Sequence, residues 1–324
     1  MKNRKERINN PSFQISCVVP CHNEAENIIS FLRTLQPTLK NISNNVEIII
    51  VDDGCTDNTS SLAIHESNID SVKLIRLSRN FGKELAITAG LEHSTGDVTV
   101  IIDADFQHPI DLIPVFIAKW VEGFDMVYAV RETREDESLL KRTFTKFFYR
   151  INELMAEVKI PPNAGDFRLL DKKAVAAINT CNERVRFMKG LYAWVGFKSI
   201  AIPFQVQPRQ KGTSSWRFAK LLELAITGIT SFSSIPLRFW GIVGFIVSFA
   251  SITYGICIII DTLLFGVDVP GYSTIVTAIM FFGGIQLLSI GIIGEYVGRI
   301  FNEVKDRPKY IIEEKIGFDN DKSI

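Results

Sequence analysis

The sequence has no excess of charge of either sign, few cysteines and no cysteine pair of the CxxC type. Of its 324 residues, 36 are Lys or Arg and 36 are Asp or Glu, so the formal net charge is +0. A general nucleic-acid-binding protein would show a basic excess, and no nucleic-acid partner is therefore expected. The five cysteines are expected to be free thiols in a reducing compartment or in lipid, rather than a zinc site or a disulfide framework.

Two further absences concern the N-terminus and the loops that cradle phosphate. Residues 1–12 are polar and contain no apolar run, so we expect a polar N-terminal tail without a signal peptide, and a soluble part that stays in the cytoplasm. The patterns GxGxxG and GxxxxGKS/T do not occur. A diphosphate ligand would therefore need a metal ion and basic side chains in place of a backbone cradle.

Charged residues are also missing from two long runs near the C-terminus, 239–260 and 272–294. Each run has about the 20 residues that a membrane-spanning helix needs. Lys and Arg flank the outer ends of the pair, and the loop between the runs has neither. The positive-inside bias predicts a multi-pass protein of the inner (cell) membrane, with a hairpin over 235–300, spans at about 237–262 and 272–296, and both termini cytoplasmic. Two buried core helices are the alternative.

The segments on either side of this hairpin have patterns of their own. In residues 213–234, Arg217, Lys220 and Glu223 begin a polar stripe at helical spacing, opposite an apolar face. This pattern is typical of an amphipathic helix in the membrane interface, although an ordinary packing helix is the alternative. Residues 301–324 are expected to form a cytoplasmic C-terminal tail.

Residues 13–212 alternate short apolar runs with helical stretches. The runs ISCVV, VEIIIV, VKLIRL, DVTVII and DMVYAV are separated by helical patterns at 24–39, 57–65, 81–93 and 109–122. This alternation predicts an α/β domain with a mainly parallel sheet. Ligands of such sheets bind beyond the carboxyl ends of the strands. The polar clusters PCHNE, DDGCTDN, SRNFGK and DADFQH stand at those predicted ends.

The cluster DADFQH contains two carboxylates directly after an apolar strand, which are costly to bury unless a cation satisfies them. If the segment is extended, residues 103, 105 and 107 face the same way. Asp103, Asp105 and the Gln107 carbonyl are hard oxygen ligands suited to Mg²⁺ or Mn²⁺ shared with a substrate's phosphates. A lone DxD pattern is weak evidence by itself, and His108 is interpreted as a loop residue or a neighbour of the ligands.

Five motifs stand in an order that resembles family 2 glycosyltransferases of the GT-A fold: VVPCHNE, VDDGCTD, SRNFGK, DADFQHP and GDFRLLD. With the two-span hairpin, the chain resembles more narrowly the polyprenyl-phosphate glycosyltransferases. These include dolichol-phosphate mannose synthase, the aminoarabinose transferase ArnC and, nearest in pattern, the bactoprenol (GtrB-like) glucosyltransferases. The resemblance implies a GT-A (Rossmann-like) domain, an interfacial helix and a transmembrane hairpin. It also implies a metal-dependent, inverting transfer of a hexose to a polyprenyl phosphate at the cytoplasmic membrane face.

For the substrates, the resemblance implies glucose from UDP-glucose and undecaprenyl phosphate, with a product used in cell-surface glycan modification. Mannosyl, GlcNAc or aminoarabinose transfer is the alternative within the family. The chain has no QxxRW motif, and with two spans it does not fit a processive polysaccharide synthase. A membrane scaffold that binds nucleotide-sugar without catalysis is the alternative from another class.

The same resemblance assigns roles to individual residues. Asp103, Asp105 and Gln107 would hold the metal, with Asp103 also a nucleotide-sugar ligand and Asp105 part of the catalytic group. Asp166 would lie by the reacting carbon and Arg168 would meet the lipid phosphate. The remaining assignments are a uridine pocket (Pro20, Asn23, Glu24, Asp52, Asp53), diphosphate or sugar ligands (Arg79, Lys83) and a phosphate clamp at the membrane surface (Arg209, Lys211).

Several of these assignments have plainer alternatives. Asp53-Gly54 could simply form a turn, Arg79 and Lys83 could be solvated charges, and Arg209 and Lys211 could anchor the chain beside the membrane. Asp166 could act as a base, orient Arg168, or stabilise positive charge on the sugar, because a phosphate monoester with a second pKa of about 6 is already largely ionised.

The expected partners are membrane lipids, the two substrates, a downstream flippase and a second glycosyltransferase. A homo-oligomer, for example a tetramer, is also expected. The second predicted span contains Gly283, Gly284, Gly291 and Gly294, which allow close approach of helices between copies or within one hairpin.

Overall fold

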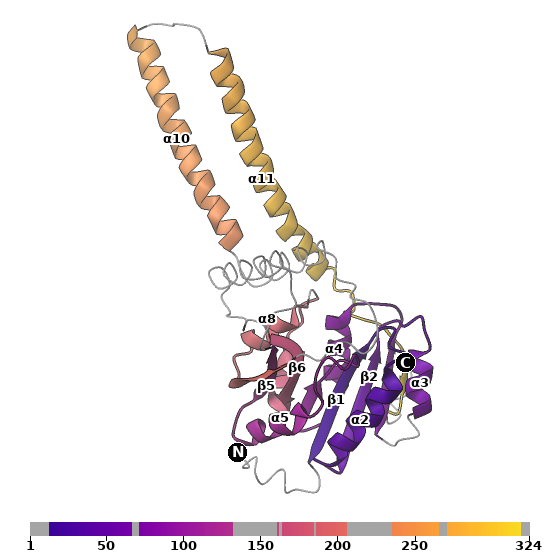
Figure 1. Ribbon diagram of the computed structural model, residues 1–324. Helices are drawn as coiled ribbons and strands as arrows, with labels where there is room; N and C mark the ends of the chain where they lie inside the picture. The colour runs from indigo at the N-terminus through magenta and orange to yellow at the C-terminus, as the bar shows by residue number, and fades with distance from the viewer. Residues whose placement is uncertain are drawn as a thin grey trace.

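An eight-stranded sheet and a pair of long helices make up the described structure, a computed structural model that covers residues 13–66, 71–131, 161, 164–184, 186–205, 235–265 and 271–318 (Figure 1). The predicted interfacial helix at 213–234 and the predicted clamp residues Arg209 and Lys211 lie outside these ranges. The strands are β1 (Gln14–Cys21), β2 (Asn45–Asp52), β3 (Val72–Leu77), β4 (Val98–Ile101), β5 (Met126–Arg131), β6 (Ala164–Asp171), β7 (Ser199–Phe204) and β8 (Ile312–Ile316). The helices of the sheet domain are α2 (Ile28–Lys40), α3 (Thr59–Glu66), α4 (Lys83–His93), α5 (Leu112–Val121), α7 (Lys172–Thr180) and α8 (Met188–Trp194).

The sheet has the strand order β7-β5-β6-β4-β1-β2-β3-β8. Pairs β1–β2, β1–β4, β2–β3 and β5–β7 are parallel, whereas β6 runs antiparallel to both of its neighbours and β8 runs antiparallel to β3. The predicted α/β fold with a mainly parallel sheet is therefore confirmed. The five apolar runs read from the sequence correspond to β1–β5, and the four helical patterns to α2–α5.

Helices cover both faces of the sheet, which explains why its central strands are continuous apolar runs. Seven of the eight residues of β1 are buried, and so are seven of the eight residues of β2. Phe31 of α2 and Phe116 of α5 belong to the core on one face. Ile87 of α4, Val175 of α7 and Met188 of α8 belong to the core on the other face. All five cysteines are free thiols, as predicted.

Three strands, β6, β7 and β8, were not predicted from the sequence. Strand β6 carries the motif GDFRLLD and lies between β4 and β5, where Arg168 pairs in register with Ile101 and Tyr128. Strand β8 follows the long helices, pairs with β3 and forms one edge of the sheet. Part of the expected C-terminal tail thus belongs to the sheet, and an ion pair between Arg76 and Glu314 at 2.9 Å joins β3 to β8.

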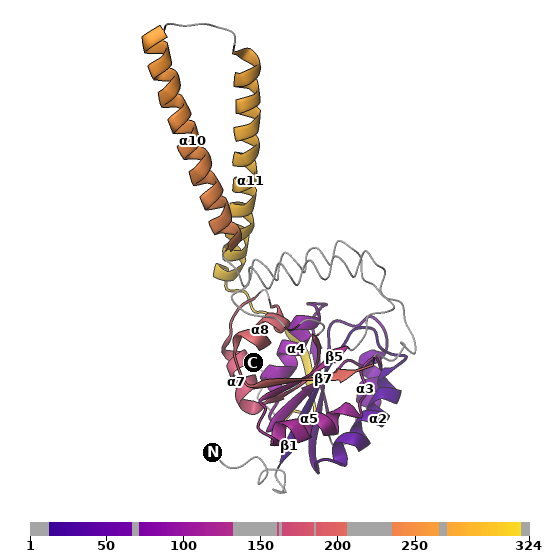
Figure 2. The same cartoon turned by 60° about the vertical axis from the view of Figure 1, so that its left-hand side comes forward.

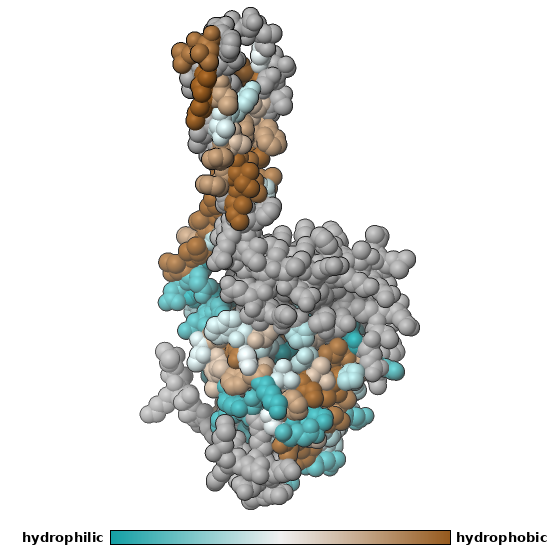
Figure 3. Space-filling view, turned by 90° about the vertical axis from the view of Figure 1, so that its left-hand side faces the viewer, coloured by the Kyte–Doolittle hydropathy of each residue, from teal (hydrophilic) through white to brown (hydrophobic). Residues whose placement is uncertain are grey.

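The long helices α10 (Ile235–Phe265) and α11 (Tyr272–Val304) run side by side away from the sheet domain (Figures 1 and 2). Apolar side chains cover much of their described surface (Figure 3), and Phe245 and Leu263, for example, are more than 70% exposed. Within the described residues, Phe281–Val304 of α11 is long and apolar enough to cross a membrane. At the base of the pair, Arg184 forms an ion pair of 2.9 Å with Asp306, which ties the loop after α7 to the end of α11.

Candidate active site

The polar loops that follow β1, β2, β3 and β4 meet at one edge of the sheet, where β6 begins. Direct contacts join them: the amide of Thr56 donates to the side chain of Asn23 at 2.8 Å, and the ammonium group of Lys83 lies 2.7 Å from Asp103. The clusters that the sequence placed at strand ends are therefore one site. Carboxyl ends of parallel strands converge in this way because the strands share one direction.

Asp53 holds two of these loops together. Its carboxylate, on a residue that is 3% exposed, accepts the backbone N–H groups of Phe81 at 2.7 Å and Gly82 at 2.9 Å. Burial raises its pKa. The next residue, Gly54, has a φ of +65°, and a Cβ atom there would lie 2.3 Å from the backbone nitrogen of Asn80. The turn at Asp53-Gly54 thus packs the loop after β2 against the loop after β3.

Asp52 is occupied in a similar way. It accepts the amide of Cys55 at 2.6 Å and the hydroxyl of Ser60, and its second oxygen lies 3.4 Å from the Arg76 side chain. At 2% exposure the carboxylate is fully enclosed by these partners. Both acids therefore shape the predicted uridine pocket through the loops that they hold, and direct contact with a nucleotide stays a prediction for each.

The other predicted uridine residues lie at the end of β1. Pro20 is buried within the strand, opposite Val51 of β2. Asn23 has a φ of 58°, a conformation that Asn tolerates better than most residues. The Glu24 carboxylate accepts the Asn27 side-chain amide at 2.9 Å. The first two loops thus form a rigid wall beside Asp103.

Lys83, the first residue of α4, links two carboxylates at the centre of the site. Its ammonium nitrogen lies 2.7 Å from Asp103 and 2.9 Å from Asp166, which come from different strands. Burial alone would lower the pKa of Lys83, but the two carboxylates raise it well above its usual value. Burial would raise the pKa of Asp103 and Asp166, but Lys83 holds both below their usual range. Lys83 is therefore ion-paired with both carboxylates, and 44% of its side chain is exposed.

The backbone between Asp103 and Gln107 forms a turn, so the predicted extended conformation is wrong here. Strand β4 ends at Ile101, and Phe106 has a φ of 58°. The Asp105 carboxylate accepts the Gln107 amide at 3.0 Å, which is a local turn contact that competes with a strand. The turn keeps both carboxylates at the end of β4, but the simple alternation of an extended strand does not govern which way they face.

A metal ion at this position would need oxygen atoms from a ligand. In the parts of the chain that the structure describes, no three His, Cys, Asp or Glu side chains form a group able to hold an ion by themselves. Asp103 and Asp105 nevertheless supply hard oxygen donors, and the lowered pKa of Asp103 keeps it ionised. This donor set fits Mg²⁺ or Mn²⁺ shared with phosphate groups, and it does not fit a closed protein cage.

His108 lies next to Asp103 in the protein interior. It is 6% exposed, packs against the rings of Phe167 and Phe204, and its Nε2 atom lies 3.7 Å from the Asp103 carboxylate. This is the neighbouring position expected for it from the sequence.

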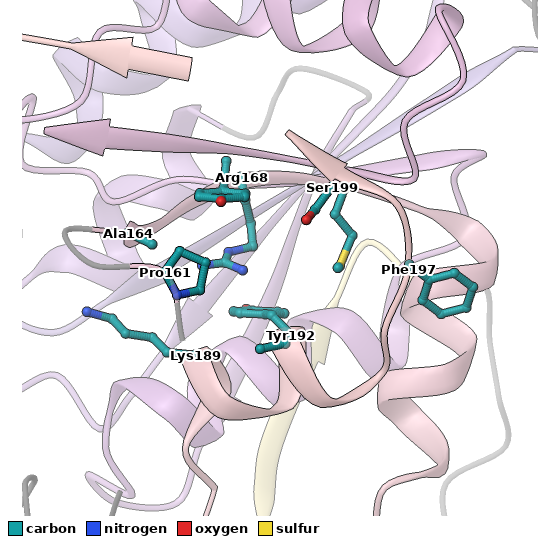
Figure 4. Close-up of a pocket in the computed structure, with 10 residues that line it drawn as sticks. Pro161, Ala164, Arg168, Lys189, Tyr192, Phe197 and Ser199 are labelled. Carbon is teal, nitrogen blue, oxygen red and sulfur yellow. The ribbon is translucent and has the colours of Figure 1, made fainter. Parts of the chain in front are cut away.

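Asp166 and Arg168 lie two residues apart on β6, where the pairing with β5 is irregular, and the charge of Asp166 acts on Arg168. Arg168 is 4% exposed, donates to the Gly165 carbonyl at 2.6 Å, and stacks on the Tyr192 ring, with 3.5 Å between the guanidinium carbon and the ring centre. Burial lowers its pKa. Arg168, Tyr192 and Tyr128 border a cavity of about 140 Å³ (Figure 4).

Glu84 links this cavity to the central lysine. It follows Lys83 on α4 and accepts the amide of Met188, the first residue of α8, at 2.8 Å. Burial, followed by the nearby charge of Asp166, raises its pKa to about 7. The contact fixes α8, which carries Lys189 and Tyr192, against the start of α4.

The remaining predicted residue, Arg79, is exposed. It donates to the carbonyl of Asn80 at 2.9 Å and lies over the ring of Phe81. These contacts are with its own loop, so a role toward the donor stays a prediction.

Sequence reasoning missed Glu84, Tyr128, Lys189 and Tyr192. Glu84 directly follows the motif SRNFGK, so its position could have been found there. The other three lie on β5 and α8, in segments with no motif, and only the pairing of β6 brings them to the site.

Residues 16–178 match the model of Glycosyl transferase family 2, and residues 235–300 match the GtrB C-terminal hairpin. An uncharacterized glycosyltransferase of Synechocystis sp. is 44% identical over 95% of this chain and 97% of its own length. A prophage-derived bactoprenol glucosyl transferase of Shigella flexneri is 44% identical over 93% of this chain and 98% of its own length. A solved glucosyl-3-phosphoglycerate synthase from Mycobacterium tuberculosis aligns with a TM-score of 0.45 and 16% identity, covering 69% of this chain and 79% of that one.

Proposed function

The chain belongs to glycosyltransferase family 2 and carries the GtrB C-terminal hairpin, and on this basis we propose that it transfers glucose from UDP-glucose to a polyprenyl phosphate at a membrane surface. The observation that carries the proposal is the Lys83 bridge between Asp103 and Asp166. It joins the acidic end of β4, suited to a nucleotide diphosphate, to the start of β6, next to buried Arg168. The bactoprenol relatives support glucose as the sugar and undecaprenyl phosphate as the acceptor.

The donor would bind at the end of β4. Asp103, Asp105 and Gln107 would hold a divalent cation there, and this ion would offset the charge of the diphosphate that leaves. The loops held by Asp52 and Asp53 would form the nucleoside pocket, with Pro20, Asn23 and Glu24 as its wall. When the diphosphate binds, Lys83 is within reach to exchange one of its carboxylate partners for a phosphate oxygen.

The reaction would be a direct displacement at the anomeric carbon. An oxygen of the acceptor phosphate forms the new bond as the bond to the UDP oxygen breaks, which inverts the configuration. A phosphate monoester is largely a dianion at neutral pH, so it needs little help from a base. Arg168 would hold this phosphate against repulsion from the donor.

Asp166 is better suited to an electrostatic role than to proton abstraction. Its pKa is held below the usual range by Lys83, and a carboxylate with a lowered pKa is a weak base. We propose that Asp166 orients Lys83 and stabilises positive charge that develops on the sugar ring.

The helix pair α10 and α11 would place the site at the membrane. The helices have 31 and 33 residues, and at about 1.5 Å per residue each is longer than the hydrocarbon core of a bilayer, which is about 30 Å thick. We also propose that both helices cross the membrane and that the site lies on the cytoplasmic side. Arg209 and Lys211 would contact phosphate, and the chain would associate into a homo-oligomer.

A donor screen tests the proposed function. Membranes that contain the full chain are incubated with undecaprenyl phosphate and radiolabelled UDP-glucose, UDP-GlcNAc, GDP-mannose or UDP-aminoarabinose, and lipid-linked product is extracted and counted. We expect product from UDP-glucose that disappears with EDTA and returns with Mg²⁺ or Mn²⁺. Product from another donor alone would replace glucose in the proposal, and no metal-dependent product from any donor would favour the non-catalytic scaffold.

A further inference from the structure

A cavity of about 140 Å³ lies beside Asp166, between β5, β6, β7 and α8. Figure 4 shows Arg168 reaching from β6 toward Tyr192 on α8, with Lys189 of the same helix at one end of the cavity and Phe197 at the other. We propose that this cavity binds the phosphate group of the acceptor, and that Lys189 and Tyr192 are binding residues for it together with Arg168. The inference rests on the proposed function and adds two residues to it.

The guanidinium of Arg168 is poorly satisfied by the protein. It donates to one carbonyl oxygen, lies over the rings of Tyr192 and Tyr128, and has the charges of Asp166 and Glu84 nearby, but within the described residues its Nε atom is buried without a hydrogen-bond partner. Burying a cation is costly unless an anion or several acceptors surround it. A ligand that supplies negatively charged oxygen atoms would remove this cost.

The Tyr192 hydroxyl is the second unpartnered group. Tyr192 is 2% exposed, and its hydroxyl oxygen has no hydrogen-bond partner in the described part of the chain. Burial raises its pKa, so the hydroxyl keeps its proton and can donate it. Buried tyrosine hydroxyls normally find a partner, so this one is consistent with a site that a ligand completes.

The chemistry of the cavity selects an oxyanion. Arg168 and Lys189 can only donate hydrogen bonds, and Tyr192 has a proton to donate. A water molecule occupies about 30 Å³ in the liquid, so the cavity has room for a group of several atoms such as a phosphate. A sugar could use the Tyr128 and Ser199 hydroxyls that also line the cavity, but it would leave the two cations without an anion.

The location favours the acceptor's phosphate over the donor's. Asp166 lies near enough to Arg168 for its charge to act on it, and Lys83 lies between the carboxylates of Asp166 and Asp103. A phosphate in the cavity would lie next to the proposed position of the sugar carbon, on the side of Lys83 away from the diphosphate. Glu84, which accepts the Met188 amide, keeps α8 in place for this contact.

The test uses the full chain in nanodiscs, with Lys189→Met and Tyr192→Phe. Lys198→Met is the matched control, because Lys198 is exposed and lies over Phe124, 4.6 Å from the ring centre, outside the cavity lining. We expect Lys189→Met to raise the KM for polyprenyl phosphate about tenfold or more, and Tyr192→Phe to raise it about threefold to tenfold. The KM for UDP-glucose should change less than about twofold in both, given that the donor binds elsewhere.

A binding measurement distinguishes failure of this inference from failure of the proposed function. Ligands that bind the native state raise the unfolding temperature, which we would record with farnesyl phosphate, inorganic phosphate and UDP. The inference is supported if farnesyl phosphate and inorganic phosphate stabilise the wild type but not Lys189→Met or Tyr192→Phe, while UDP stabilises all three. This outcome supports it even if no transfer is found. Loss of the UDP effect instead, or variants that behave like Lys198→Met in both measurements, would overturn it. Tyr192→Phe keeps the ring that stacks on Arg168, so its effect does not depend on a fold change.

Discussion

The two sides of Lys83 differ in charge and in how they are built. On the β4 side, carboxylates dominate, and they are tied to backbone amides, as in the contacts of Asp53 with Phe81 and Gly82. On the β6 side, Arg168 and Lys189 border a cavity, and buried polar groups there lack partners among the described residues. The carboxylates of the first side have partners within the protein, whereas on the second side the buried Nε atom of Arg168 and the Tyr192 hydroxyl have none among the described residues.

This difference corresponds to the problem that the proposed reaction poses. Two anionic substrates must meet at one carbon atom, and each needs its own source of positive charge. An acidic side can bind a diphosphate through a shared metal ion, whereas a side with free cationic donors can bind a phosphate directly. Lys83, paired with one carboxylate from each side, is the group that both substrates would approach.

Asp103→Asn should have the largest effect on the β4 side. Loss of one anionic oxygen weakens the metal and diphosphate site, and we expect kcat/KM to fall about 10²–10³-fold. Measured transfer at several Mn²⁺ concentrations checks this. Asp111→Asn is the control, because Asp111 is exposed and its side chain does not cap α5. An Asp103→Asn enzyme with normal metal dependence would contradict the assignment.

Asp166→Asn tests the boundary between the two sides. We expect turnover to fall about tenfold to a hundredfold with little change in donor affinity, because the variant removes a charge beside the sugar and releases Lys83. Removal of a general base costs about 10²–10⁴-fold, so a loss at the upper end of that range would favour proton abstraction instead. Near-normal turnover would exclude Asp166 from the mechanism.

Asp53→Ala should lower the stability of the protein, because Asp53 holds two loops of the β4 side together. It leaves two buried N–H groups without an acceptor, which costs about 1–3 kcal/mol of unfolding free energy for an unsatisfied group. Asp53→Asn keeps one acceptor oxygen and should cost less. Thermal unfolding of both variants checks the order, and equal stability of wild type and Asp53→Ala would show that the loop contact is unimportant.

Glu84→Gln should have the smallest effect, visible as a change in pH dependence. The pKa of Glu84 is raised from 4.5 to about 7, so between these values the native state binds a proton that the unfolded chain has lost. The contribution of Glu84 to stability therefore falls as pH rises through this window. The charges of Asp166, Lys83 and Lys189 act on this carboxyl group. As the pH is raised from 5.5 to 8, the unfolding temperature of the wild type should fall relative to that of Glu84→Gln. A difference that stays constant with pH would contradict the raised pKa.

The sequence predicted more of the β4 side than of the β6 side. Parallel strands were recognisable because continuous apolar runs end in polar clusters, and this alone brought Asp53, Asp103 and Lys83 to one edge of the sheet. The antiparallel insertion of β6 could not be predicted, because the apolar run in GDFRLLD is short and the segment contains three charged residues. Without that pairing, Tyr128 and the α8 residues have no signal that connects them with Asp166. The turn at Phe106 was also missed, because its left-handed backbone depends on the local Asp105 contact.

The division into a donor side and an acceptor side can be tested most directly by calorimetric titration of UDP-glucose, with Mn²⁺ present, into the wild type, Asp103→Asn and Lys189→Met. The account predicts that Asp103→Asn weakens UDP-glucose binding about tenfold or more, while Lys189→Met binds it like the wild type. Normal binding by Asp103→Asn together with weakened binding by Lys189→Met would contradict it, because the donor would then lie on the β6 side.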